Sequence, residues 1–135
     1  MKAILQVFII VSLSFGTLFS SEIKRITLKK DEQKKILVKY GEVEKLFKFR
    51  WTLYVNKGLV ILRSYDRVVA QNVLYTRHKN QSFRQELKTR GADNYTVPYI
   101  LVMFKEFNYD KNEALFDLMI SDKKEQIELK YLKNS

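Results

Sequence analysis

Hydrophobic and polar residues alternate along residues 47–55, near the middle of the chain. The apolar positions of this stretch are Phe47, Phe49, Trp51, Leu53 and Val55. Successive side chains of a β-strand point to opposite faces, whereas a helix turns about 100° per residue and would spread such positions around its whole surface. The alternation therefore predicts a β-strand that buries one face, and it places Tyr54 on the polar face.

A tight reversal follows this strand. Residues 56–58 (Asn-Lys-Gly) suit a three-residue hairpin loop in which Gly58 takes up the left-handed backbone conformation. The chain returns as residues 59–62, which are apolar on both faces and therefore leave two registers open. Leu53 and Trp51 lie opposite Ile61 and Arg63 in the first register, and opposite Leu62 and Ser64 in the second. Because strand 43–55 is long for a small domain, we expect it to bend or to carry a bulge.

Further short stretches that read as strands recur up to the C-terminal residues. They span residues 23–29, 35–40, 67–77, 99–104, 114–121 and 126–132. The first two of these strands are expected to form a hairpin. Residues 99–104 are apolar on both faces, which predicts a central strand covered on both sides. Residues 83–89 fit either a two-turn helix, begun by a capping box at Ser82 and ended at Gly91, or a strand, and we favour the strand.

The pattern as a whole predicts one all-β domain over residues 21–135. We expect an antiparallel β-sandwich or a partly open barrel of about seven to nine strands. The connections are too short to cross over between parallel strands, so neighbouring strands should be antiparallel. A chain of 135 residues suits one such domain and is short for two.

Residues 1–20 are unlike the rest of the chain. One lysine precedes an apolar run from Ala3 to Phe15, and small and apolar residues follow up to Ser21. This is the layout of a secretory signal peptide, a helix that is removed after export, with cleavage after Ser20 or Gly16. The alternative is an uncleaved helix that anchors the protein in the inner membrane, although the run is slightly short for the roughly 20 residues of a membrane span.

The net charge of the chain narrows the classes of partner that it can bind. The chain has 25 basic and 15 acidic side chains and a formal net charge of +10, which becomes +9 without residues 1–20. An exported protein meets phospholipid headgroups and anionic polymers of the cell envelope, so we expect no nucleic-acid partner.

The chain contains no cysteine, so neither a disulfide nor a lipid attached to cysteine is expected, and the core alone must stabilise the domain.

The basic residues are the clearest collective feature of the sequence. Candidate contacts to an anion or a partner are Lys24, Arg25, Lys29, Lys30, Lys34, Lys35, Lys48 and Arg50. The alternative is a solubilising surface with lysines that protect the strand edges. Asp31 and Glu32 support this alternative, because they interrupt the run of basic residues between Lys24 and Lys35. Aromatic rings offer a second kind of contact, since they stack on sugars, and Tyr54 and Tyr95 are the candidates for such a glycan site.

Catalytic and metal-binding patterns are weak. His78 is the single histidine and stands between two cations, and no nucleophile-elbow or glycine-rich phosphate-binding motif occurs. Residues 110–113 resemble part of a calcium loop, but the glycine and the distal glutamate of that loop are missing. We therefore expect no catalytic residue, no metal and no cofactor, with an unrecognised carboxylate site as the enzymatic alternative.

These features together predict a non-enzymatic binding or accessory module of a bacterial cell envelope, exported to the periplasm. Its contacts would be made to a protein partner through strand edges, because edges offer unpaired backbone groups. The alternative is a binder of anionic lipid or glycan through a cationic face. The salt dependence of binding distinguishes these two hypotheses, because dissolved ions screen contacts between charges more than they weaken backbone hydrogen bonds between strands.

Overall fold

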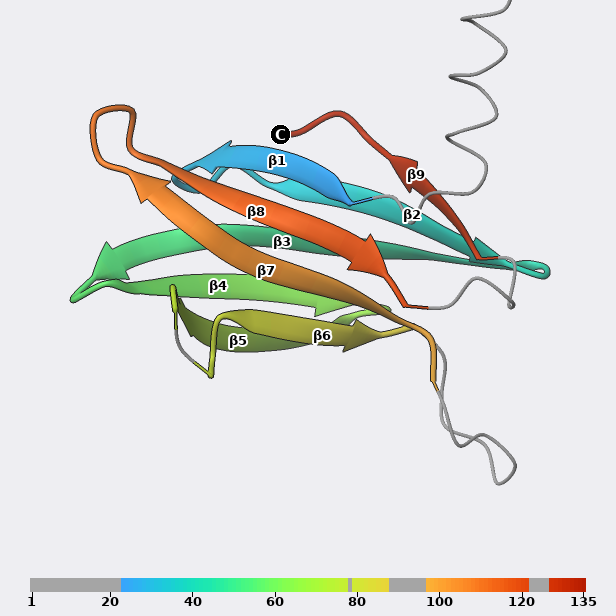
Figure 1. Cartoon of the computed structure of the whole chain (residues 1–135). Helices are drawn as coiled ribbons and strands as arrows, with labels where there is room; N and C mark the ends of the chain where they lie inside the picture. The colour runs from blue at the N-terminus through green and yellow to red at the C-terminus, as the bar shows by residue number, and fades with distance from the viewer. Residues whose placement is uncertain (1–22, 78, 88–96, 122–126) are drawn as a thin grey trace, which may run out of the picture.

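Within the part of the chain that the structure describes, every regular element is a β-strand. The computed structural model describes residues 23–77, 79–87, 97–121 and 127–135 (Figure 1). The strands are β1 (Lys24–Lys29), β2 (Lys34–Tyr40), β3 (Val43–Val55), β4 (Gly58–Tyr65), β5 (Val68–Tyr75), β6 (Ser82–Glu86), β7 (Tyr99–Asn108), β8 (Glu113–Ile120) and β9 (Glu128–Tyr131). Among the described residues no helix is suited to cross a membrane. The predicted leader, residues 1–20, lies outside them and stays a prediction.

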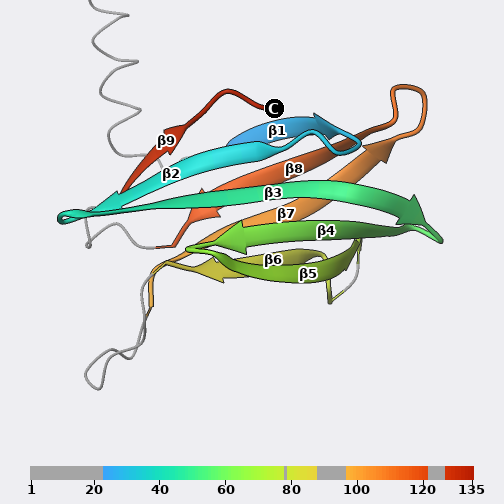
Figure 2. The same ribbon diagram turned by 180° about the vertical axis from the view of Figure 1, so that it is seen from behind.

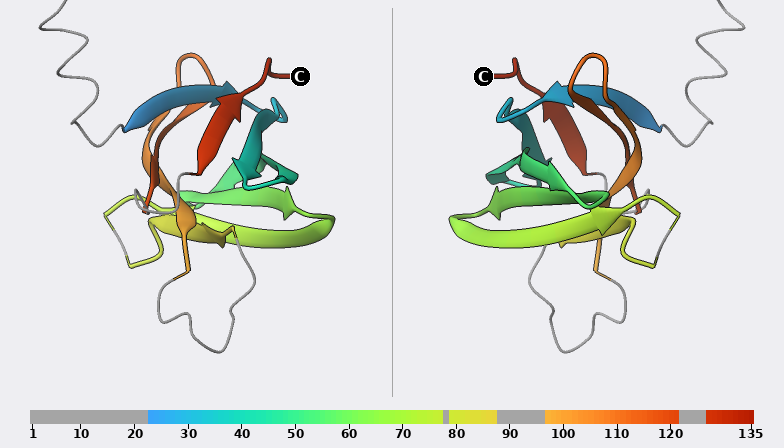
Figure 3. Two further views of the ribbon diagram at one scale, coloured as in Figure 1. Left: turned by 90° about the vertical axis from the view of Figure 1, so that its right-hand side faces the viewer. Right: turned by 90° about the vertical axis from the view of Figure 1, so that its left-hand side faces the viewer.

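The strands form two antiparallel sheets that pack as a β-sandwich. One sheet has the order β1-β8-β7-β6 and the other the order β5-β4-β3-β2-β9. Seen along the strands, the two sheets face each other around a common interior (Figure 3). The all-β class, the antiparallel pairing and the expected strand number are confirmed.

The predicted hairpin of the first two strands is wrong. β1 pairs with β8 in one sheet, whereas β2 pairs with β3 and β9 in the other. The chain therefore changes sheets between β1 and β2, and it does so again after β5 and after β8 (Figure 2). Alternation within a strand fixes which face is buried, but it carries no information about which strand is the neighbour.

Aromatic side chains from both sheets fill the interior. The fully buried rings are those of Phe47, Phe49, Trp51, Phe104 and Phe116. Phe49 meets Phe116 of the opposite sheet edge to face, with ring centroids 5.5 Å apart. Two buried hydrogen bonds also reach across the sandwich: Trp51 Nε1 donates to Leu28 O at 2.7 Å, and Tyr65 Oη donates at 2.7 Å to the carbonyl of Leu87, which follows β6.

The reversal after β3 is a two-residue turn, so both predicted registers are wrong. Asn56 and Lys57 have φ values of 52° and 65°, as a tight turn matched to the twist of its strands requires. Trp51 lies opposite Ile61, and Gly58 is the first residue of β4 rather than a loop residue. Gly58 is needed for space, because a Cβ there would lie 2.9 Å from a ring carbon of Tyr75.

The expected irregularity of the long strand is confirmed as a bulge, and it changes which side chains are buried. Trp51 pairs with Ile61 and Leu53 with Val60, so Thr52 is the extra residue. Leu53 and Val55 were expected in the core, but they point outward and are 49% and 52% exposed. Tyr54 turns inward instead and packs against the core, so its assignment to the polar face is wrong.

The structure also describes the segments predicted at residues 83–89 and 99–104, apart from residues 88 and 89. β6 is a strand rather than a helix, over Ser82–Glu86. β7 is an inner strand of its sheet, as expected. Its second face is only half covered, however, because Tyr99, Leu101 and Met103 are partly exposed, so the expectation of a strand covered on both sides is wrong.

Candidate functional site

The predicted basic contact residues lie on several separate surfaces. Lys24 and Lys34 meet at the opening between β1 and β9, where their Nζ atoms lie 5.0 and 5.3 Å from the centroid of the Tyr131 ring. Lys34 is buried, and burial, followed by the nearby Lys24 charge, lowers its pKa. The Lys34 side chain therefore packs at the border of the core and is not a freely exposed surface cation.

Arg25 has an internal partner on the outer face of the four-stranded sheet. Its Nε donates to Asp117 Oδ1 at 3.0 Å, and this bond and charge raise the pKa of Arg25. Lys105 approaches the other oxygen of Asp117 at 4.0 Å. Lys29 and Lys30 are exposed where β1 ends, and Lys35, Lys48 and Arg50 lie on the outer face of the five-stranded sheet.

Arg84 is a further basic residue that the structure describes, whereas the loop residues His78 and Tyr95 fall outside its described ranges. Arg84 lies on the outer face of β6, with its guanidinium 4.1 Å from the Tyr99 ring centroid. Among the described residues no three acidic or histidine side chains gather in a way that would hold a metal ion.

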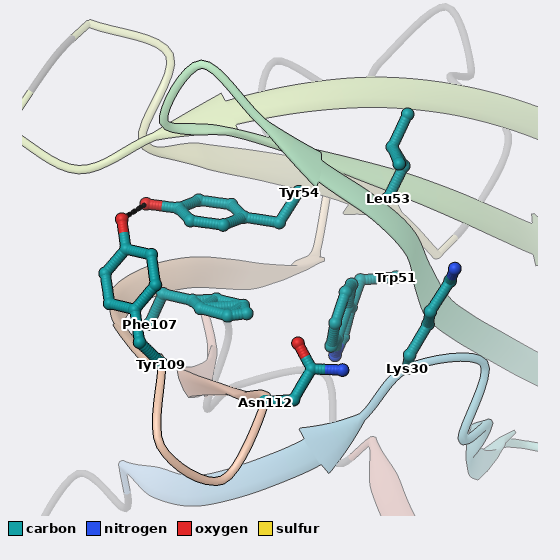
Figure 4. A pocket seen from close by; sticks show the side chains of 7 residues that line it. All are labelled: Lys30, Trp51, Leu53, Tyr54, Phe107, Tyr109 and Asn112. Carbon is teal, nitrogen blue, oxygen red and sulfur yellow. Dashed lines mark hydrogen bonds between the residues drawn. The ribbon is translucent and has the colours of Figure 1, made fainter.

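A groove with aromatic walls opens at the end of the sandwich that holds the β3–β4 and β7–β8 turns (Figure 4). It has a volume of about 260 Å³. Its lining residues are Lys30, Trp51, Leu53, Tyr54, Phe107, Tyr109 and Asn112. A second hollow of about 610 Å³ shares the Tyr54, Phe107 and Tyr109 side chains and is bordered by charged residues of both signs.

Two bulges build this aromatic wall. The extra residue Thr52 in β3 turns Tyr54 inward, and a second register shift between Phe104 and Glu106 does the same for Phe107 in β7. The two rings then stack with centroids 4.0 Å apart and an angle of 6° between their planes. Each bulge thus re-aims one side chain across the sandwich.

The rings of the groove largely bind one another. One face of Tyr54 is covered by Phe107, and the hydroxyl groups of Tyr54 and Tyr109 share a hydrogen bond of 3.2 Å. Burial, then this hydrogen bond, raises the pKa of Tyr54 to about 12. Trp51 is 1% exposed and its indole nitrogen donates to Leu28. Tyr109, at 71% exposure, is the ring of this set most open to a ligand.

β5 forms a different kind of candidate site, an unguarded sheet edge. Its eight residues, Val68–Tyr75, contain no charged residue and no proline. Val68 and Val69 are 70% and 66% exposed, and Val73 is exposed as well. Natural edge strands are usually short or carry charges that discourage pairing with another chain. β5 has neither form of protection.

Within the described ranges, the backbone of β5 offers groups without a hydrogen-bond partner at Val69, Gln71 and Val73. The Tyr75 N–H bonds Asn80 O at 3.0 Å and therefore points away from β4. Because backbone groups of a strand alternate between its two sides, the N–H and C=O groups of Val73, Gln71 and Val69 also point away from β4. Their side chains share the outer face of the sheet. A further strand would find both hydrogen-bonding groups and apolar side chains here.

The other edges of the described sandwich are guarded. β1 carries Lys24, Arg25 and Lys29, and β9 has only four residues, with Glu128 and Lys130 among them. β6 has five residues, and Arg84 and Glu86 are two of them. The contrast is visible in the sequence, because VVAQNVLY is an uncharged run in a chain of which 30% is charged. This contrast did not enter the prediction of contact residues, and the sequence does not show that β5 ends a sheet.

Arginines stand at both ends of the β5 edge. Arg67 precedes β5 in the turn from β4, and Arg77 follows it in the connection to β6. Both side chains are exposed. The edge is thus uncharged along its length, with a positive charge at each end.

Comparison of the chain with protein-family models, with curated protein sequences and with solved structures finds no match in any of the three.

Proposed function

We propose that this domain is a non-enzymatic binding module that takes up an extended segment of a partner protein as an additional strand beside β5. The proposal includes export: the module works in the cell envelope once residues 1–20 have directed it there. The unguarded edge of β5 carries the proposal, because it combines length, lack of charge and unpaired backbone groups at Val69, Gln71 and Val73.

The surroundings of the edge define the chemistry of the partner segment. Strand addition draws its affinity from backbone hydrogen bonds and its specificity from alternate side chains. Valine, isoleucine or threonine at alternate positions would pack beside Val69 and Val73 on the outer face. Carboxylates near the two ends of the segment would meet Arg67 and Arg77, which supports an acidic partner for a chain of net charge +10.

A second copy of the chain suits the edge less well. Two β5 strands paired antiparallel about their Asn72 residues would set Arg67 of one copy opposite Arg77 of the other, at both ends of the interface. Like charges directly opposite each other destabilise a strand pair. The protein should therefore be monomeric when no partner segment is present.

The experiment uses a short peptide that alternates valine and threonine between terminal glutamates. Titrated into the protein and followed by NMR, it should shift the backbone amides of β5 and leave those of β1 and β9 in place. A matched peptide, N-methylated at alternate residues, removes half of the backbone donors and should not bind. Binding should persist when the ionic strength is raised to about 0.3 M, since backbone pairing is screened little.

Variants at Gln71 test the same site from the side of the protein. The Gln71 N–H points away from β4, so Gln71→Pro removes a donor that only the partner uses and leaves the β4–β5 ladder intact. Gln71→Thr is the control, because it keeps the donor. Equal binding by both variants, or binding of the N-methylated peptide, would refute strand addition at β5. Salt-sensitive binding to anionic polymers with no response to the peptide would favour the cationic-surface alternative.

A further inference from the structure

The outer face of the five-stranded sheet contains a hollow between cations. It has a volume of about 250 Å³ and lies over β3, β4 and β5, beside Gln33, which precedes β2. Its lining residues are Gln33, Lys48, Arg50, Leu62, Arg63, Ser64 and Val69. Lys48 and Ser64 are cross-strand partners, as are Arg50 and Leu62, so the small serine leaves the depression beside the two longer cations.

Three cations around this hollow, Lys35, Lys48 and Arg50, have no acidic partner among the described residues. Lys35 of β2 is the cross-strand partner of Lys48, and like charges in that position destabilise a sheet. Within the described part of the chain, Lys35, Lys48 and Arg50 make no ion pair, although each is half-buried.

The same two strands show the ordinary arrangement four positions further along. Lys39 of β2 lies opposite Glu44 of β3, and the two form an ion pair of 3.6 Å. The strand pair can therefore place an acid opposite a lysine, and at Lys35 and Lys48 it does not. An external anion is the group that would relieve this repulsion.

We propose that the hollow over Ser64 binds a phosphate group, held between Lys48 and Arg50 with Lys35 at its margin. The arginine fork matches two oxygens of a tetrahedral phosphate, and a lysine ammonium contributes a mobile point charge. The Ser64 hydroxyl and the Gln33 amide supply further donors. This site adjoins the β5 edge at Val69, but phosphate binding does not depend on strand addition there.

Inorganic phosphate is the first probe. Titrated into the protein against chloride at constant ionic strength, it should shift the NMR signals of Lys48, Arg50 and Ser64. Lys48→Gln and Arg50→Gln should each weaken binding by about tenfold, the effect of a lost charge-assisted contact of roughly 1.4 kcal/mol. Lys39→Gln changes the net charge by the same amount away from the hollow and should leave binding unchanged. Equal losses in all three variants would mean general charge attraction and would overturn the site.

Vesicles then distinguish the source of the phosphate group. Vesicles with phosphatidylglycerol are compared with vesicles of phosphatidylcholine alone, for the protein and for the Lys48→Gln/Arg50→Gln variant. Binding that requires phosphatidylglycerol and is lost in the variant assigns the site to a lipid headgroup. Binding of inorganic phosphate without vesicle binding assigns it to a soluble phosphorylated compound. If neither probe binds, or if the folded variant binds both as well as the parent protein, the hollow is no phosphate site.

Discussion

Trp51 links the two sheets through its indole nitrogen, which donates to Leu28 O at 2.7 Å in the buried interior. Trp51→Phe removes this bond, leaves a buried carbonyl without its donor and opens space in the core. We expect the free energy of unfolding to fall by about 2–4 kcal/mol, measured by urea denaturation. The exposed Tyr109→Phe serves as the control and should change stability by less than about 1 kcal/mol. A similar small effect of both changes would contradict the assigned role of Trp51.

Lys57 occupies a backbone conformation that suits glycine. Its φ of 65° lies in the left-handed region, which a Cβ disfavours. Lys57→Gly should therefore raise the free energy of unfolding by up to about 1 kcal/mol, measured by thermal and urea denaturation. Gly58→Ala, one residue further on, should lower it, because the new Cβ meets the Tyr75 ring at 2.9 Å. The two substitutions should thus change the free energy of unfolding in opposite directions. A loss of stability in Lys57→Gly would contradict the assignment of a two-residue turn at Asn56 and Lys57.

The Tyr54 hydroxyl should lose its proton at a higher pH than an ordinary tyrosine. Burial and the Tyr109 hydrogen bond raise its pKa from 10.0 to about 12. The folded state holds this proton more tightly than the unfolded state, so the stability contributed by Tyr54 is full below pH 10 and is lost as the pH rises towards 12. NMR titration of labelled tyrosine measures the pKa directly. Tyr109→Phe should lower it only in part, because burial remains, and an unchanged value would show that the hydroxyl contact is absent.

At the scale of elements, period-two alternation predicts most strands but fails where a bulge intervenes. Both bulges follow the same sequence feature, an aromatic residue repeated three positions later: Trp51 and Tyr54, then Phe104 and Phe107. Two residues three apart lie on opposite faces of a regular strand, so both rings reach the interior only if one residue is extra. The spacing was readable in the sequence. Its meaning required knowing that the two inner rings would stack on each other.

Deletion of Thr52 tests the bulge. Since Trp51 already pairs with Ile61 and Leu53 with Val60, removing the residue between them keeps every buried side chain on its own face. The variant should fold, with a change in stability of about 1–2 kcal/mol from the altered bend of β3. Deletion of Lys48 is the control, because it shifts one part of the strand by a residue and turns aromatic side chains out of the core. Far-ultraviolet circular dichroism and urea denaturation compare the two, and failure of both to fold would contradict the assignment of Thr52.

Sheet neighbours are the part of the fold that the sequence could not provide. Val69, Val73 and Tyr75 were expected to share a face, and they do share the outer face of β5. Whether that strand was an edge depended on β6 joining the other sheet, a contact between distant segments. The same limit explains the predicted cationic face: Lys24 and Lys35 are close in sequence, but they belong to different sheets.

At the scale of the whole molecule, the positive charge is distributed rather than concentrated in one patch. Arg25 is engaged with Asp117, Lys34 is packed at the opening between β1 and β9, and Lys48 and Arg50 flank the hollow on the five-stranded sheet. The net positive charge raises the rate at which anionic partners are encountered, while the geometry of the β5 edge determines which of these partners stay bound.

Amide hydrogen exchange with and without the valine-threonine peptide tests strand addition most directly. In the free protein, the amides of Val69, Gln71 and Val73 should exchange quickly and those of Ala70, Asn72 and Leu74 slowly, because the latter already bond β4. The peptide should slow the first set by at least about tenfold and leave the second set unchanged. Uniform protection along β5, or protection of β1 or β9 instead, would contradict the proposed mode of binding.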